Sequence, residues 1–221
     1  MPIAENIRKI KETIPQNVKL VAVSKTYPVA DILEAYRAGQ YFFGENKVQE
    51  IDSKQAALPK DTEWHFIGHL QTNKVRFLAP FVSLIHGADS LKLLKTIDKE
   101  AAKINREIAC LLQFHIAEED TKFGLSYDEA AEMLESPDFL TLQHAKVCGV
   151  MGMATFTDDF RRVRDEFRRL RNIFEQLRSN CFSGDHSFKE VSMGMSDDYK
   201  IAIDEGSTIV RIGSSIFGKR K

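Results

Sequence analysis

A lysine follows directly after a short apolar run in the segment VKLVAVSKTYP, residues 18–28. Residues 20–23 have the composition of a buried strand, and Pro28 begins the next turn. An amine at the end of a buried strand is partly desolvated, which lowers the pKa of its ammonium form and makes it a nucleophile toward aldehydes. The alternative is a lysine that extends into water or pairs with Glu45, so Lys25 by itself does not decide the function.

A second group of candidate residues lies near the other end of the chain, in STIVRIGSSIFG, residues 207–218. The backbone N–H groups of a Gly-Ser turn such as Gly213-Ser214 can point together at one anion, and the start of a helix favours negative charge. Arg211 precedes this turn, and Ser192 of the segment SMGMS offers a hydroxyl group. The string also fits an ordinary turn, so a phosphate site is one of two interpretations.

The pattern between these segments indicates how they are brought together, because short β-rich runs alternate with longer amphipathic ones. Strands are predicted at residues 19–23, 41–43, 63–67, 81–85, 107–115, 146–151, 188–193 and 208–212. Helices are predicted at residues 29–38, 47–56, 72–78, 90–104, 127–134, 158–177 and 197–203, and an amphipathic helix at the N-terminus precedes them. Eight strands that alternate with helices in this way are typical of a closed parallel barrel.

A doubly wound open sheet would alternate in the same way, but it usually has fewer strands and a glycine-rich first turn. The first turn here, SKTYP, contains no glycine. The length of 221 residues is also close to the ~250 residues of a typical barrel. We therefore expect an α/β protein with a single (β/α)8 TIM-barrel domain over residues 1–221. In such a barrel the carboxyl ends of the strands carry the site.

Composition excludes several classes of function. The net charge of -1, from 31 basic and 32 acidic side chains, gives no attraction for nucleic acid. No apolar run approaches the roughly 20 residues of a membrane span, and the charged N-terminus lacks the apolar segment of a signal peptide. The three cysteines lie far apart, which suits free thiols in the cytoplasm. His65 and His69 are four residues apart, a spacing that suggests a metal pair only when both lie on one helix, and Gly68 lies between them at the end of a predicted strand. His86, His115 and His144 have no carboxylate or cysteine at a recognised ligand spacing, so we expect no metal site.

Five segments, AVSKTYP, FGENKVQE, WHFIGHLQTNK, MGMATF and SMGMSDDYKIAIDEGSTIVRIGSSIFG, follow one another between residues 22 and 218. Together they resemble the pyridoxal-phosphate homeostasis protein family. The resemblance implies a barrel similar to the N-terminal domain of alanine racemase, with pyridoxal 5'-phosphate (PLP) held as an aldimine on Lys25. It further implies the other cofactor-binding residues: Ser192, Gly213 and Ser214 at the phosphate, Arg211 at the pyridine nitrogen, and Asn46 and His65 in the pocket lining.

The function implied by the resemblance is that of a PLP carrier or regulator in vitamin B6 homeostasis, which affects amino-acid and keto-acid balance indirectly. Its partners would be PLP and PLP-dependent apo-enzymes, and we expect a monomer. The alternative is a racemase-like or lyase enzyme that acts on small amino acids through the same lysine. Racemases similar to this barrel carry a second domain with an opposing tyrosine acid/base, which this sequence lacks, so we expect no catalytic residues.

A third interpretation is a docking protein that presents the arginine-rich segment RRVRDEFRRLRNIF, residues 161–174, to a partner. The expected apolar stripe of this helix consists of Phe160, Val163, Phe167, Leu170 and Phe174. An outer helix of the barrel, with its charged face in water, explains the same pattern more simply.

Overall fold

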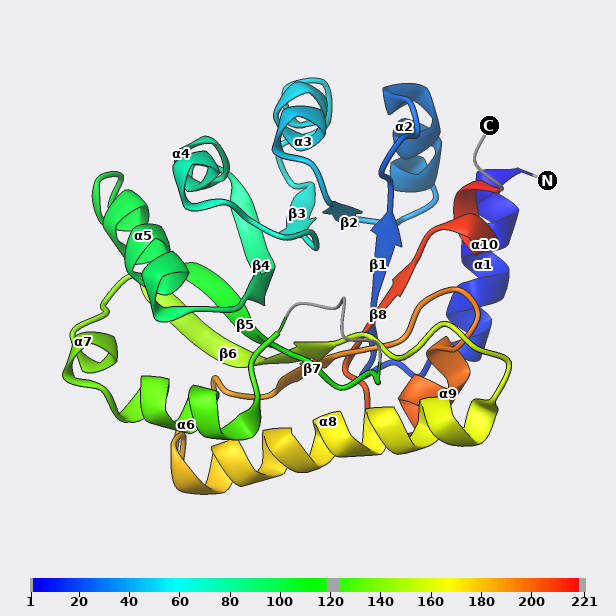
Figure 1. The fold of residues 1–221 in the computed structure, drawn as a ribbon. Coiled ribbons are helices and arrows are strands. Elements are labelled where there is room, and N and C mark those ends of the chain that lie inside the picture. Colours follow the sequence, from blue (N-terminus) through cyan, green and yellow to red (C-terminus); the bar gives the residue numbers. More distant parts are fainter. Residues whose placement is uncertain (1, 119–123, 219–221) are drawn as a thin grey trace.

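The computed structural model describes residues 2–118 and 124–218. Within them, strands pair in sequence order and in parallel, and β8 pairs with β1 to close a barrel (Figure 1). The strands are β1 (Lys19–Val23), β2 (Phe42–Glu45), β3 (Glu63–Phe66), β4 (Val82–Ala88), β5 (Ile108–Phe114), β6 (Ala145–Gly152), β7 (Glu190–Ser192) and β8 (Ile209–Ile212). The expected (β/α)8 barrel is therefore confirmed.

Helices surround the barrel and connect its strands (Figure 1). The longer ones are α1 (Ile3–Thr13), α2 (Val29–Arg37), α3 (Val48–Gln55), α5 (Leu91–Ala102), α6 (Tyr127–Glu135) and α8 (Phe160–Asn180). The shorter ones are the 3-10 helix η1 (Thr72–Lys74), α4 (Val75–Leu78), α7 (Pro137–Leu140), α9 (Tyr199–Asp204) and α10 (Ser214–Phe217). In the part of the chain that the structure describes, none of the helices has the length and apolar character needed to cross a membrane.

Differences from the sequence-based expectation lie mainly at the ends of elements. The helix expected at residues 158–177 begins at Phe160, because the side chain of Asp159 accepts hydrogen bonds from the N–H groups of Arg161 and Arg162 as a cap. Sequence reasoning missed α7, which begins at a proline and is capped by Ser136. The helix expected at residues 72–78 is divided into η1 and α4.

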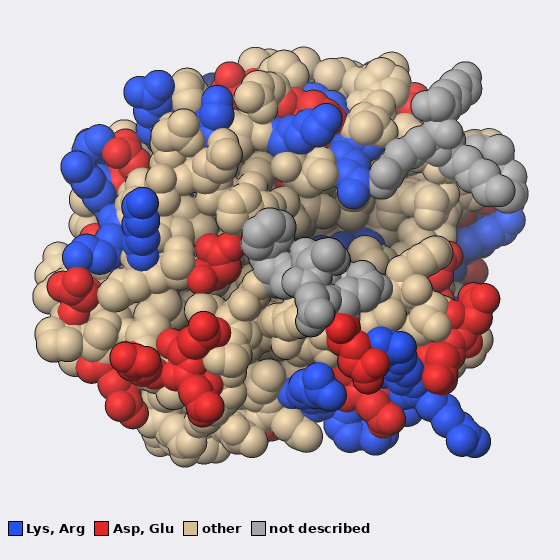
Figure 2. Space-filling view, in the orientation of Figure 1, with Lys and Arg blue, Asp and Glu red and all other residues tan. Residues whose placement is uncertain are grey.

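Helix α8 packs on the outside of the barrel, as the simpler interpretation expects. Four of the five expected stripe residues are buried, but Phe160 is 60% exposed, so its place in the stripe was wrong. The arginines make ion pairs within the chain, such as Arg164 with Glu205 at 2.6 Å and Arg168 with Asp165 at 3.1 Å. Figure 2 shows acidic and basic side chains mixed near the start of this helix. The charged face is therefore largely neutralised by the protein's own carboxylates.

The interior of the barrel is apolar in one layer and polar in the next. The apolar layer consists of Val21, Leu84, Leu111, Met151 and Ile209. A chain of buried polar groups also lies within the barrel. His65 Nδ1 lies 3.0 Å from His86 Nε2, His86 Nδ1 lies 2.9 Å from Ser192 Oγ, and Arg211 Nη1 donates to Ser192 Oγ at 2.5 Å. A second Arg211 nitrogen, Nη2, donates to the carbonyl oxygen of Gly152.

The arginine fixes the direction of this chain, because a guanidinium group only donates hydrogen bonds. Ser192 accepts from Arg211 and can direct its own hydrogen to His86 Nδ1, which leaves the His86 proton on Nε2, facing His65. Desolvation and the positive charge of Lys19 lower the pKa of His65 to about 3. Desolvation also lowers the pKa of His86 well below its ordinary value, and His65 and Arg211 add to this effect. Both rings are therefore neutral at physiological pH.

We expect the free energy of unfolding to fall as the pH is lowered through 6.5, because unfolded His65 takes up a proton there while the folded side chain stays neutral down to about pH 3. In this window His65 contributes a slope of about 1.4 kcal/mol per pH unit. Urea unfolding measured between about pH 6 and pH 4.5 gives the change of the free energy of unfolding with pH. In His65→Gln this slope should be smaller than in the wild-type protein by about 1.4 kcal/mol per pH unit. The exposed His186→Gln serves as the control. An unchanged slope in His65→Gln would contradict this assignment.

Candidate functional site

A cavity of about 420 Å³ lies at the carboxyl ends of the strands. Its volume falls in the range of small-molecule sites, roughly 300–1,000 Å³. The residues Lys25, Asn46, Arg211, Gly213 and Ser214 line it, together with others from the loops of the same barrel end. The barrel thus brings five of the seven residues expected at the site to one cavity.

Lys25 reaches the cavity because side chains alternate along β1. Val21 and Val23 face the barrel interior, so Lys25 continues the inward series while Ser24 points outward. The N–H of Tyr27 donates to the carbonyl oxygen of Ser24 at 3.1 Å and closes a turn around Lys25. The lysine side chain is therefore presented on a tight turn rather than on a mobile loop.

The turn after β1 is attached to the last helix of the described chain. The hydroxyl of Tyr27 donates to the carbonyl oxygen of Gly218 at 2.5 Å, and its ring stacks on Phe217 with the ring centroids 4.8 Å apart. These contacts connect the segment that carries Lys25 with α10, which begins at Ser214. They also show that Tyr27 packs at the rim of the barrel.

A second group of cavity residues comes from β8, the neighbour of β1 in the barrel, and from the start of α10. The first N–H groups of a helix have no acceptor within the helix, so those at Ser214 and Ser215 are suited to meet an anion. The N–H of Gly213 donates to Ser196 Oγ at 3.3 Å.

The side chain of Arg211 is buried, with only 4% of the residue exposed. Desolvation lowers the pKa of Arg211 to about 10, although the charge of Asp198 acts in the opposite direction. The guanidinium group is still charged at neutral pH.

Ser192 and His65 are placed differently from the other five expected site residues. Both are buried within the barrel and neither belongs to the cavity lining, and the hydroxyl of Ser192 is bonded to Arg211 and His86. They support the group that lines the cavity, Arg211, and their direct contact with a ligand stays a prediction.

Sequence reasoning missed two residues of this region. Ser196 lines the cavity and accepts from Gly213. It lies in the segment SMGMS, and the glycine of this segment was the available signal for a turn. In the structure Gly194 has a φ of +94°, which residues with a side chain rarely adopt. His86 was considered only as a metal ligand, and its contact with Ser192 joins strands that sequence spacing does not relate.

A close backbone contact positions Asn46. A side chain at Gly68 would place its Cβ 2.5 Å from the carbonyl oxygen of Asn46, so only glycine lets the loop after β3 pass the loop after β2. Both loops line the cavity.

The donors at the cavity define its chemistry. They include an amine, a guanidinium group, hydroxyl groups and the side-chain amides of Asn46 and Gln113, and the lining also contains His69, Asp197 and apolar side chains such as Met153 and Phe156. Within residues 2–118 and 124–218, no three histidine, cysteine or acidic side chains are grouped so that they could hold a metal ion. The arrangement suits an anionic ligand with an apolar ring and a group that reacts with amines.

Comparisons with known proteins support this interpretation. The model of the family "Alanine racemase, N-terminal domain" matches residues 2–221. The pyridoxal phosphate homeostasis protein of Aquifex aeolicus is 40% identical over 223 residues, which cover 99% of this chain and 96% of that protein. The protein of the same name from Pasteurella multocida is 36% identical over 233 residues and covers 100% of this chain and 98% of that protein.

Solved structures show the same likeness. PipY of Synechococcus elongatus PCC7942 solved with PLP bound has a TM-score of 0.89 and 35% identity, covering 98% of this chain and 100% of that chain. Alanine racemase of Bartonella henselae, with covalently bound pyridoxal phosphate, has a TM-score of 0.71 at 17% identity, and the match covers 99% of this chain but 60% of that chain. The second likeness concerns the fold alone. From its matched length and identity, the chain belongs to the pyridoxal phosphate homeostasis protein family, and its fold is that of the alanine racemase N-terminal domain.

Proposed function

We propose that this protein binds pyridoxal 5'-phosphate as an aldimine on Lys25 and serves as a carrier or regulator of the cofactor in the cytoplasm. The observation that carries the proposal is the shared cavity: the amine from β1 and the anion-binding groups at the start of α10 line the same space. The family relatives named for pyridoxal phosphate homeostasis and the PLP-bound structure of PipY support it.

The residues present fit the cofactor. Gly213 and Ser214 would lie at the phosphate, where Ser214 offers a backbone N–H group, Arg211 would face the pyridine nitrogen, and Asn46 lines the wall. PLP supplies a reactive aldehyde. The Lys25 nitrogen adds to the aldehyde carbon, a C=N bond replaces C=O, and one water molecule leaves, so the step requires no oxidant or reductant.

Arg211 alone does not decide between carrier and enzyme, because racemases similar to this barrel are understood to have an arginine in the same place. A charged guanidinium group facing the pyridine nitrogen opposes protonation there, because both groups would be donors. An unprotonated ring is the weaker electron sink. The relatives are named as homeostasis proteins, which favours a carrier over a racemase-like or lyase enzyme. We further propose that the protein acts as a monomer and that PLP-dependent apo-enzymes receive the cofactor.

Lys25→Ala is expected to abolish the covalent adduct. Protein loaded with PLP should show the absorption band of a lysine aldimine, and borohydride should fix the cofactor to the peptide that contains residue 25. Mass spectrometry of the digested protein measures this directly. Attachment of all the cofactor to another lysine in the wild-type protein would contradict the assignment.

Arg211→Glu is expected to change the protonation of bound PLP more than its retention, because the proposed contact of Arg211 is with the ring and not with the phosphate. A carboxylate accepts the hydrogen of a protonated ring nitrogen, so the absorption spectrum should shift toward the pyridinium form. Arg211→Gln, which places a neutral amide at this buried position, is the second variant. A pH titration of the spectrum and equilibrium dialysis measure the two effects, and equal loss of PLP binding without a spectral change would refute the proposed contact.

Amino-acid turnover by the loaded protein is expected not to exceed that of free PLP under the same conditions. Racemisation of alanine and loss of small amino acids can be followed by chiral chromatography. Efficient, saturable turnover that disappears in Lys25→Ala would show that the protein is an enzyme.

A further inference from the structure

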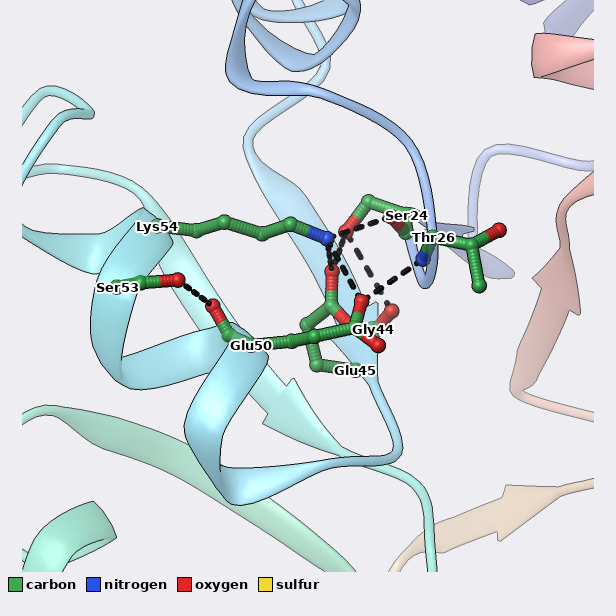
Figure 3. Close-up of polar contacts among 7 residues, drawn as sticks. All are labelled: Ser24, Thr26, Gly44, Glu45, Glu50, Ser53 and Lys54. Atoms are coloured by element: carbon green, nitrogen blue, oxygen red, sulfur yellow. Dashed lines mark hydrogen bonds and ion pairs between the residues drawn. The ribbon is translucent and has the colours of Figure 1, made fainter.

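A cluster of polar and charged side chains (Figure 3) contacts the backbone of Ser24 and Thr26, the two residues that flank Lys25. It joins the end of β1 and the end of β2 to helix α3. Its members are Ser24, Glu45, Glu50 and Lys54, and none of them belongs to the cavity lining. The cluster therefore has no direct access to a ligand in the cavity.

Lys54 is the centre of the cluster, and its side chain is only 9% exposed. Its Nζ donates to Glu45 Oε1 at 2.7 Å, to the carbonyl oxygen of Ser24 at 2.9 Å and to Glu50 Oε2 at 3.2 Å. An ammonium group has three hydrogens to donate, and these three bonds use all of them. Lys54 thus acts as a fixed cation that holds the peptide group immediately before Lys25.

Glu50 holds the peptide group on the other side of Lys25. Its Oε2 accepts from the N–H of Thr26 at 2.8 Å. Desolvation raises the pKa of Glu50, but the bonds from Thr26 and Lys54 outweigh it and keep the pKa below its ordinary value. The carboxylate form, which accepts both bonds, therefore prevails at neutral pH.

The backbone of this turn is strained, which explains why it needs support. Thr26 has a φ of +70°, a conformation that is unfavourable for β-branched residues. Such a residue persists where its surroundings hold it, and strain of this kind concentrates at functional sites. The two bonds from α3 clamp the carbonyl group of Ser24 and the N–H of Thr26, and Lys25 lies between them.

Stability of the fold is a weak explanation for the cluster. Glu45 is fully buried, and its Oε2 has no hydrogen-bond partner among the described residues. Burial raises the pKa of Glu45 despite the bonds from Lys54 and Ser24. A buried carboxylate oxygen without a partner is costly, and buried ion pairs often stabilise a fold less than apolar residues would.

We infer that Glu45, Glu50 and Lys54 are positioning residues that hold the backbone turn around Lys25 so that its amine is placed for covalent attachment of the ligand. The inference rests on the proposed role of Lys25 in PLP binding and adds to it. It separates two contributions to affinity. Anchoring of the phosphate and ring depends on the residues of β8 and the start of α10, whereas the covalent bond depends on this turn.

The test compares two ligands that differ at the reacting group. Pyridoxal 5'-phosphate has the aldehyde, while pyridoxamine 5'-phosphate carries an amine in its place and cannot bond covalently to Lys25. Glu50→Ala, a change at a partly exposed side chain, should weaken binding of PLP by about tenfold, equivalent to about 1.4 kcal/mol. Its affinity for pyridoxamine 5'-phosphate should change by less than about twofold.

Two further variants guard against a general loss of structure. Glu45→Gln combined with Lys54→Met removes both charges of the buried pair, which is better tolerated than removing one, and should show the same difference between the ligands. Asp98→Ala is the matched control, because Asp98 accepts from the N–H groups of Gln143, His144 and Ala145 at the opposite end of the barrel. It should leave the affinities for both ligands unchanged.

The background of Lys25→Ala makes the test decisive. With the amine removed, Glu50→Ala should cause no further loss of PLP binding, because the two changes act on one interaction. An equal loss of both ligands in Glu50→Ala, or an unchanged affinity for PLP, would overturn the inference while leaving the proposed function intact. If wild-type protein forms no covalent bond through Lys25, both proposals fail.

Discussion

The pairing of β1 with β8 is the constraint on which the candidate site depends. Val21 lies opposite Arg211 and Ala22 opposite Ile212 in this last seam of the barrel. This pairing joins residues near the start of the chain, Lys19–Ala22, to residues near its end, Ile209–Ile212. It places the amine after β1 and the anion-binding groups after β8 on neighbouring strands, at the same end of the barrel. An open sheet with the same eight strands would leave β1 and β8 on opposite edges, and no shared cavity would form.

Alternation along the strands then divides the residues between two environments. Lys25 faces the cavity, while its neighbour Ser24 faces helix α3 and the charged cluster. The interior beneath the cavity contains Arg211, His86 and Ser192, where an apolar core would be more stable. Polar groups that are buried, hydrogen-bonded to one another and adjacent to a cavity are typical of sites at which position matters more than stability.

The sequence predicted the barrel and much of the cavity because both depend on local signals. Strand and helix periodicity is a local property, and it predicts where each strand ends. Because sites in such barrels lie at the carboxyl ends of the strands, it also predicts site residues such as Lys25 and Gly213. Contacts between separate elements carry no such signal. Glu45 was considered as a partner of Lys25, whereas the structure pairs it with Lys54 from α3. Likewise, the exposure of Phe160 depends on where Asp159 caps the helix, a matter of a few residues.

A carrier must hold its cargo and also release it, and the geometry bears on both requirements. Phe156 lines the cavity yet is 86% exposed, so the cavity is bounded in part by a side chain that faces water. On the proposed function, an imine at such an opening would be accessible to water, and its hydrolysis would reverse the attachment without any other reactant. Retention of PLP would then depend on the position of the Lys25 amine relative to the aldehyde, since a preorganised group loses less conformational freedom on binding. If Glu50 and Lys54 position this turn as inferred, the strained backbone at Thr26 sets the balance between holding and release, because a change that relaxes it would displace the amine and leave the phosphate-binding groups after β8 in place.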